Sequence, residues 1–145
     1  MKKVVFSVLL VSLLFSFLSC ADDDNNSDGL SEIERRIVGT WEVQTVFLNG
    51  FDVTNPSYTD FAILFRPDRS YFAIDSEPIF TPSGGFWQFL DNDPDRLEIG
   101  GVESMLSLDD DTMILVFQAT GEQIGESGRR KGLDGDYEFT LTRTT

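Results

Sequence analysis

The sequence predicts an all-β domain, an eight-stranded antiparallel up-and-down barrel preceded by one short helix. Beyond residue 39, apolar residues recur mainly with a period of two, which is typical of strands with one buried face. The alternating stretches are short, and turns rich in Gly, Asn, Asp and Pro join each one to the next. Eight consecutive antiparallel strands can close into a barrel without a free edge. A two-sheet sandwich is the alternative, since periodicity alone does not decide closure.

The helix is expected at residues 31–37. Ser31 and Glu34 have the spacing of a capping box, in which each side chain accepts a hydrogen bond from the other residue's backbone N–H. Apolar residues within this segment share one face, and Gly39 follows its end. We therefore expect one or two helical turns packed against the domain.

The eight strands are expected at residues 41–47, 61–65, 70–75, 86–90, 96–99, 105–108, 112–119 and 137–144. In the first strand, Trp41 and Phe47 share the face that is expected to point inward. In the third strand, Phe72 and Ile74 share one face. The last strand alternates most regularly and places Arg143 on the same face as its apolar residues.

The first 20 residues have the pattern of an export signal. Lys2 and Lys3 precede an apolar run that reaches residue 18, and Cys20 is the only cysteine of the chain. A run of this length is typical of a signal peptide, because a spanning helix needs about 20 apolar residues. We expect residues 1–19 to be the signal peptide.

A short acidic segment separates the signal from the predicted domain. Residues 21–29 contain almost no apolar side chain and four aspartates, so they cannot bury a core and are expected to form a disordered tether. The predicted organisation is therefore a signal peptide at 1–19, a cysteine and tether at 20–29, and a barrel domain at 30–145.

The charge and composition exclude several functional classes. The 25 acidic and 11 basic residues give a formal net charge of −14, which argues against binding to nucleic acid or to an anionic membrane surface. The chain has no histidine, which removes Ser-His-Asp and Cys-His catalysis and histidine-based zinc sites. We expect no enzymatic activity, no cofactor and no metal. A buried carboxylate pair facing a cleft would revive the enzyme hypothesis.

One acidic segment has the opening spacing of a calcium loop. Asp91, Asp93 and Asp95 alternate as such a loop requires, but Arg96 stands where the loop needs glycine. We interpret the segment as an acidic hairpin turn.

Three segments together resemble the lipocalin-like lipoproteins of the Bacteroidetes phylum. They are IVGTW at residues 37–41, LFRPDRSY at 64–71 and GDYEFTL at 135–141. Gly39 and Trp41 form the Gly-x-Trp motif with which the lipocalin barrel begins. The resemblance implies that a basic residue of the last strand, here Arg143, packs across Trp41 and closes one end of the barrel. The alternative is that Arg143 extends into solvent.

The leader resembles a bacterial lipoprotein signal in which the cysteine becomes the first mature residue. The resemblance implies that Cys20 carries acyl chains such as palmitate, and several chains together would hold the protein firmly in the outer membrane. The acidic run after Cys20 resembles a surface-export signal, so exposure at the cell surface is expected. A position facing the periplasm is the alternative.

Two sets of residues are candidates for contact with other molecules. Aromatic side chains in or beside predicted loops are candidates for the mouth of a ligand cavity: Phe51, Tyr58, Phe80 and Trp87. A basic group in the long loop before the last strand is a candidate contact for an anionic ligand or partner: Arg129, Arg130 and Lys131.

Two functions fit these observations. The first is binding of a small apolar or amphipathic ligand inside the barrel. The second is a filled barrel that interacts with an envelope protein as an accessory module of a cell-surface complex. A cavity of about 300–1,000 Å³ with a few polar groups would favour the first. A packed interior with an exposed apolar patch would favour the second.

Overall fold

The computed structural model describes residues 29–75, 79, 83–120 and 134–144. The signal peptide, Cys20, Phe80 and the basic group at 129–131 lie outside the described residues. Within those ranges, no helix is both long and apolar enough to cross a membrane.

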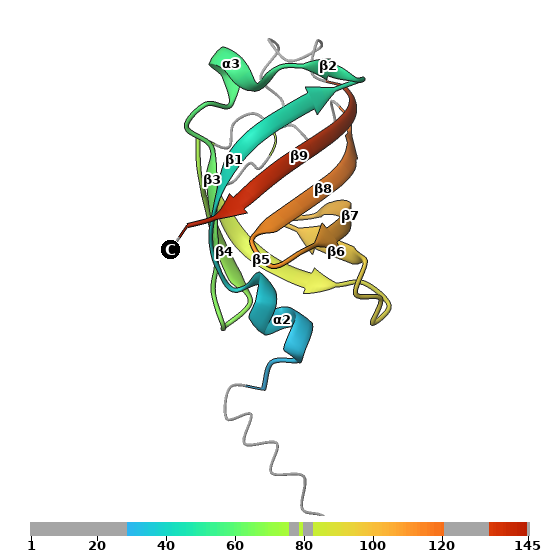
Figure 1. Cartoon of the computed structure of the whole chain (residues 1–145). Coiled ribbons are helices and arrows are strands. Elements are labelled where there is room, and N and C mark those ends of the chain that lie inside the picture. The colour runs from blue at the N-terminus through green and yellow to red at the C-terminus, as the bar shows by residue number, and fades with distance from the viewer. Residues whose placement is uncertain (1–28, 76–78, 80–82, 121–133, 145) are drawn as a thin grey trace, which may run out of the picture.

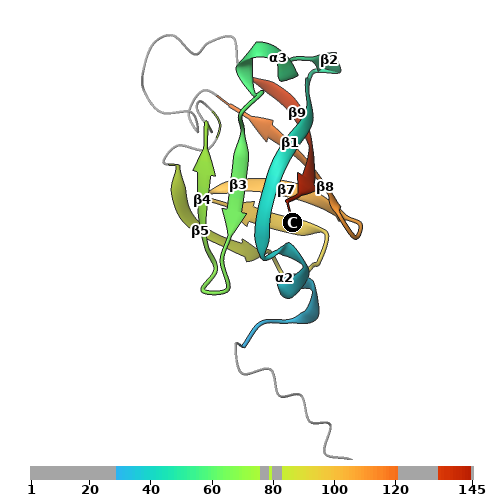
Figure 2. The ribbon, with the colours of Figure 1, turned by 60° about the vertical axis from the view of Figure 1, so that its left-hand side comes forward.

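Eight strands form a closed antiparallel barrel. Following the sheet, the order is β1, β3, β4, β5, β6, β7, β8 and β9, and β9 pairs with β1 to close the ring (Figures 1 and 2). The bounds are β1 (Gly39–Leu48), β3 (Ala62–Phe65), β4 (Ser70–Ile74), β5 (Gly84–Phe89), β6 (Arg96–Ile99), β7 (Val102–Leu108), β8 (Thr112–Ala119) and β9 (Gly135–Arg143). The predicted up-and-down barrel is confirmed, and the two-sheet sandwich is excluded.

Three short elements complete the described structure. The helix α2 (Glu32–Ile37) precedes β1, as the sequence predicts. The strand β2 (Phe51–Asp52) pairs with the end of β1, and the short helix α3 (Thr54–Ser57) follows it. These last two elements are too short to leave a periodic signal in the sequence. They lie at one end of the barrel, and α2 lies at the other (Figure 1).

The strand β7 begins three residues earlier than the sequence predicts. Gly100 and Gly101 form the whole connection between β6 and β7, with φ of +58° and +86°. Positive φ at both central residues belongs to the tight hairpin turn whose twist matches that of the flanking strands. The turn therefore needs no further residues, and Val102 already pairs with Ile99.

A β-bulge in β1 changes which of its side chains point inward. The pairing with β9 runs from Val43↔Leu141 to Thr45↔Thr140, so Gln44 has no opposite residue. An extra residue shifts the alternation by one position. Val46 is consequently buried and Phe47 is only partly buried, so the prediction that Phe47 shares the inward face of Trp41 is wrong.

Two groups of aromatic side chains fill the barrel. At the α2 end, Phe65 and Trp87 pack edge to face, with ring centroids 5.8 Å apart, and Trp41 is buried at the same end. At the α3 end, Phe117 stacks on Tyr137 with centroids 5.5 Å apart. Further rings and aliphatic side chains join them in one continuous buried cluster: Tyr58, Phe61, Ile63, Leu97, Ile99, Met113, Leu115, Phe139 and Leu141.

Candidate functional site: the outer face of β3 to β5

Two of the residues predicted to form a ligand mouth belong instead to the core. Tyr58 directly follows α3, and its side chain is only 2% exposed and packs edge to face on Phe139, with centroids 5.3 Å apart. Trp87 lies on β5, points inward and is 1% exposed. The mouth prediction is wrong for both, because closeness to a loop does not determine which way a side chain points. Phe51 on β2 is exposed.

The described interior offers no charged group to a ligand. The buried residues of the barrel are apolar apart from a few hydroxyls and indole and phenol groups, and the one buried carboxylate, Glu34, belongs to α2. Burial raises the pKa of Tyr58 far above its ordinary value, and the nearby Tyr137 hydroxyl contributes to the same shift. Burial also raises the pKa of Tyr137. Folding therefore makes both phenols harder to ionise.

Arg143 closes the α2 end of the barrel over Trp41. The guanidinium carbon lies 4.3 Å from the centroid of the Trp41 ring, in the geometry of a cation–π contact. The guanidinium also donates hydrogen bonds to the carbonyl oxygens of Val38, at 2.8 Å, and of Arg36. The contact that the shared face of Arg143 and Trp41 predicts is present, and the alternative of a solvated Arg143 is excluded.

Gly39 leaves the space that this arrangement needs. Its φ is +138°, and a Cβ at this position would lie 2.6 Å from Nη1 of Arg143. The Gly-x-Trp motif is thus explained locally. The glycine admits the guanidinium, and the tryptophan two residues later provides the ring beneath it. The indole Nε1 of Trp41 donates to the carbonyl oxygen of Ile37, at 2.8 Å, which joins α2 to the barrel.

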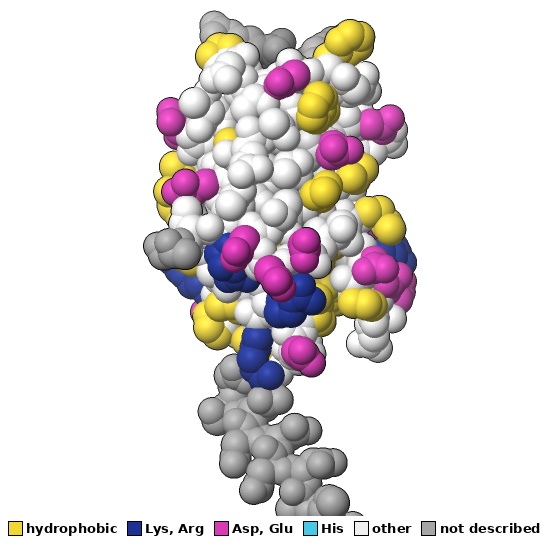
Figure 3. All heavy atoms as spheres, in the orientation of Figure 1, with side chains coloured by type: hydrophobic (Ala, Val, Ile, Leu, Met, Phe, Trp, Pro, Cys, Tyr) yellow, Lys and Arg dark blue, Asp and Glu magenta, His cyan; other side chains and the backbone are white. Residues whose placement is uncertain are grey.

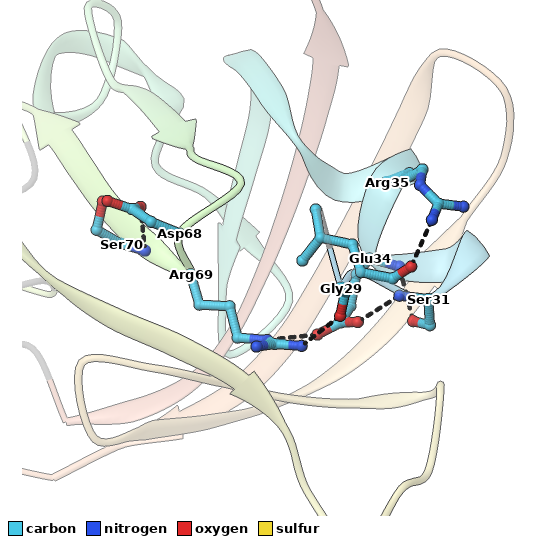
Figure 4. A network of polar contacts seen from close by, with 8 residues as sticks. Gly29, Ser31, Glu34, Arg35, Asp68, Arg69 and Ser70 are labelled. Carbon is cyan, nitrogen blue, oxygen red and sulfur yellow. Dashed lines mark hydrogen bonds and ion pairs between the residues drawn. The ribbon is translucent and has the colours of Figure 1, made fainter. Parts of the chain in front are cut away.

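A second polar network holds α2 to the turn between β3 and β4 (Figure 4). Glu34 Oε2 accepts a hydrogen bond from the Ser31 backbone N–H at 2.7 Å, and Oε1 accepts one from Arg69 Nε at 2.6 Å. Ser31 Oγ accepts in turn from the Glu34 N–H at 3.3 Å, which completes the predicted capping box. The ion pair with Arg69 lowers the pKa of Glu34 to about 2. Spacing along the chain does not predict Arg69 as the partner.

The outer face of three neighbouring strands carries a continuous set of apolar side chains. Leu64 pairs directly with Phe72, and Ala62 pairs with Ile74. Phe86 pairs with Ser70 and is therefore the diagonal neighbour of Phe72. Phe72, Ile74 and Phe86 are 45%, 51% and 74% exposed. We call this set the outer apolar patch: Ala62, Leu64, Phe72, Ile74 and Phe86.

A groove lies at the α3 end of the outer apolar patch. Its volume is about 710 Å³, and Phe72 and Ile74 contribute to its lining. The opposite wall comes from the end of α3 and the segment that follows it, and two carboxylates, Asp60 and Asp75, stand at the groove. The remaining lining residues are Pro56, Ser57, Thr59, Ala73 and Ser83.

The basic residues of the described chain are distributed unevenly. Five arginines lie at the α2 end: Arg35 and Arg36 in α2, Arg66 and Arg69 at the turn after β3, and Arg143 at the end of β9. The sixth described basic residue, Arg96, begins β6 on the side of the barrel. No described Lys or Arg lies at the end that carries α3 and β2. Figure 3 shows these side chains in dark blue, away from the α3 end.

The acidic turn between β5 and β6 is stabilised by its own contacts. Asp93 Oδ1 accepts a hydrogen bond from the Asp95 N–H at 3.0 Å, and Asp91 forms an ion pair with Arg96 at 2.7 Å. Within the described residues, no group of three or more acidic, Cys or His side chains is arranged to hold a metal ion.

A comparison of this chain with known protein families and with curated proteins finds no match in either. Its function is therefore inferred from the contrast between a filled interior and an apolar outer face.

Proposed function

We propose that this protein is a non-enzymatic protein-interaction module, held at the cell surface by acyl chains on Cys20 and working through the outer apolar patch. The observation that supports this proposal is that β4 carries apolar side chains on both faces, whereas a strand of this kind usually has polar side chains on its solvent face. Tyr71 and Ala73 are buried on the inner face, whereas Phe72 and Ile74 are about half exposed on the outer face.

The energetics favour a partner on this patch. Isolated exposed apolar residues are ordinary on a protein surface, but contiguous apolar patches mark interaction sites. Complete burial of a Phe or Ile side chain contributes about 1.5–3 kcal/mol. Burying the remaining exposed parts of Phe72, Ile74 and Phe86 would contribute a few kcal/mol to a complex, which is enough to matter for affinity.

The described N-terminal end of the domain is compatible with lipid attachment upstream. Leu30 is buried, and the Gly29 carbonyl accepts a hydrogen bond from Arg69 Nη2 at 3.4 Å. The chain toward Cys20 therefore leaves from the α2 end. The α3 end would then point away from the membrane, and the patch on the side of the barrel would be open to a neighbouring protein. A periplasm-facing position would present the same surface.

Carriage of a small apolar ligand inside the barrel is the second candidate. One observation favours it: Trp87 Nε1 and Ser104 Oγ are buried, and neither has a hydrogen-bond partner within the described residues. A polar atom of a guest molecule would satisfy such groups. The aromatic side chains that occupy both halves of the interior favour the interaction function over this one.

Two measurements separate the candidates. A photo-crosslinking amino acid is introduced at position 72 or 86 in the source cell, with position 138, on the outer face of β9, as the matched control. We expect the same protein adduct from both patch positions and none from position 138. Native mass spectrometry of the gently purified protein is the second measurement. A reproducible extra mass that denaturation releases, together with no patch-specific adduct, would contradict the interaction function and support ligand carriage.

A further inference from the structure

We propose that the groove at the α3 end of the outer apolar patch binds a cationic segment of a partner protein, in which an apolar side chain stands next to Lys or Arg. This inference rests on the proposed interaction function and specifies the chemistry of the partner.

The floor of the groove selects an apolar side chain. Phe72 and Ile74 leave about half of their surface open there, whereas the side chain of Ala73 between them is buried on the inner face of the strand. Pro56 and Ser57 contribute to the facing wall. An inserted aliphatic or aromatic side chain would remove apolar surface from water on both sides of the contact. The volume of about 710 Å³ admits a short stretch of chain rather than a single side chain.

The rim of the groove selects a positive charge. Asp60 and Asp75 are both exposed, and neither carboxylate forms an ion pair within the described residues. The described arginines cannot neutralise them, because five lie at the α2 end and the sixth, Arg96, already pairs with Asp91 and Glu103. An approaching Lys or Arg would find two carboxylates that no described Lys or Arg neutralises, and an approaching Asp or Glu would be repelled.

The same charges argue against other occupants. An anionic lipid surface and nucleic acid would both meet the carboxylates of the rim. A second copy of this chain would bring its own Asp60 and Asp75 to a symmetric contact, where like charges oppose association. A cationic apolar protein segment complements both the floor and the rim.

The test is selection of a phage library of random dodecapeptides on the full-length protein, kept in the same non-ionic detergent in every arm. Parallel selections use the floor variant Phe72→Thr/Ile74→Thr and the rim variant Asp60→Asn/Asp75→Asn. The controls are Met105→Thr, which removes an exposed apolar side chain from the outer face of β7, and Asp110→Asn in the β7–β8 turn. Threonine preserves strand propensity, and thermal unfolding of each variant verifies that it folds.

We expect the selected sequences to combine apolar residues with Lys or Arg and to bind both controls as they bind the unaltered protein. Affinity should fall by about tenfold or more in the floor variant. In the rim variant we expect a smaller loss of affinity and a weaker dependence on salt. Selected sequences that are neutral or acidic, yet are lost in the floor variant, overturn the cationic partner and leave the interaction function standing. Three results overturn both the cationic partner and the interaction function. They are selected sequences that bind the floor variant equally well, self-association in place of peptide binding, and no enrichment at all.

Discussion

The ion pair between Glu34 and Arg69 makes a quantitative prediction about stability and pH. Replacing Glu34 with Gln preserves the side-chain carbonyl that accepts the Ser31 N–H, but it removes the negative charge beside Arg69. The folded state lowers the pKa of Glu34 from an ordinary value of 4.5 to about 2. A difference of this size corresponds to about 3 kcal/mol of stability when the carboxylate is ionised. The Arg69 side chain is 47% exposed, so solvent screening reduces our expectation to about 1–2 kcal/mol.

The direction of the pH dependence follows from the lowered pKa. A carboxyl group whose pKa is lowered by folding stabilises the protein above its unfolded value of 4.5, and this contribution is lost as the pH falls toward about 2. Urea unfolding of the two proteins at a series of pH values measures the difference. We expect Glu34→Gln to be less stable near neutral pH and the gap to narrow below about pH 4.

Two further variants isolate the ion pair. Glu32→Gln removes a carboxylate from the same helical turn without touching Arg69, and it should change stability much less. Arg69→Gln should cost less in the Glu34→Gln background than in the unaltered protein, because the two changes remove the same interaction. A stability gap that stays constant from neutral to acidic pH would refute the reasoning, since helix capping or packing would then account for the whole effect.

Three other predictions concern the barrel itself. Gly39→Ala should lower the free energy of unfolding by about 2 kcal/mol, because φ is +138° and the new Cβ would lie 2.6 Å from Arg143 Nη1; an unchanged urea midpoint would contradict this. Arg143→Lys keeps the charge but loses the planar fork that covers Trp41 and reaches two carbonyl oxygens, so we expect a loss of about 1–2 kcal/mol and a changed near-ultraviolet circular dichroism spectrum. Burial raises the pKa of every tyrosine, so alkaline titration of phenolate absorbance should show ionisation at a higher pH in the folded protein than in the unfolded chain, and stability should fall as the pH rises above about 10; native phenolates that form at the same pH as in the unfolded chain would count against the packed interior. The tyrosines concerned are Tyr58, Tyr71 and Tyr137.

The strand pattern of this fold is predictable because the sheet buries its inner face in the barrel and exposes its outer face to solvent. The last strand illustrates this, since Tyr137, Phe139 and Leu141 are all buried while the residues between them are exposed or partly buried. The resemblance to lipocalin-like lipoproteins implies the contact between Arg143 and Trp41, and the inward alternation of both positions is consistent with it; the pairing of Trp41 with Arg143 confirms it.

Alternation fails where apolar residues occupy both faces of a strand. In β4, Tyr71 and Ala73 alternate with Phe72 and Ile74, so hydrophobicity does not identify the inward set. Burial distinguishes them: the outer pair has no layer of protein over it within the described structure. The outer apolar patch was therefore not predicted, because apolar side chains on a solvent face break the alternation from which burial is predicted. The same apolar exposure makes the patch a candidate site.

Single-residue irregularities account for the other differences. The bulge at Gln44 is invisible in a sequence whose polar and apolar residues continue to alternate, yet it moves Phe47 away from the inward set. Tyr58 stands in a segment rich in polar and turn-forming residues, and only the return of the chain over the end of the barrel buries it. Neither event has a local sequence signal, because each depends on a partner far away in the chain.

The pairing of β1 with β9 sets the order in which the protein can fold. These strands lie at opposite ends of the domain sequence, so joining them closes a loop that contains all the other described strands. Contacts this distant along the chain must overcome a large loop-closure entropy, and such topologies fold slowly. Until β9 is in place, β1 and β8 each keep an edge with unpaired backbone groups, which is a template for aggregation. We therefore expect any chain that ends before Gly135 to remain unfolded or to aggregate, and stopped-flow refolding to show ring closure as the slow step.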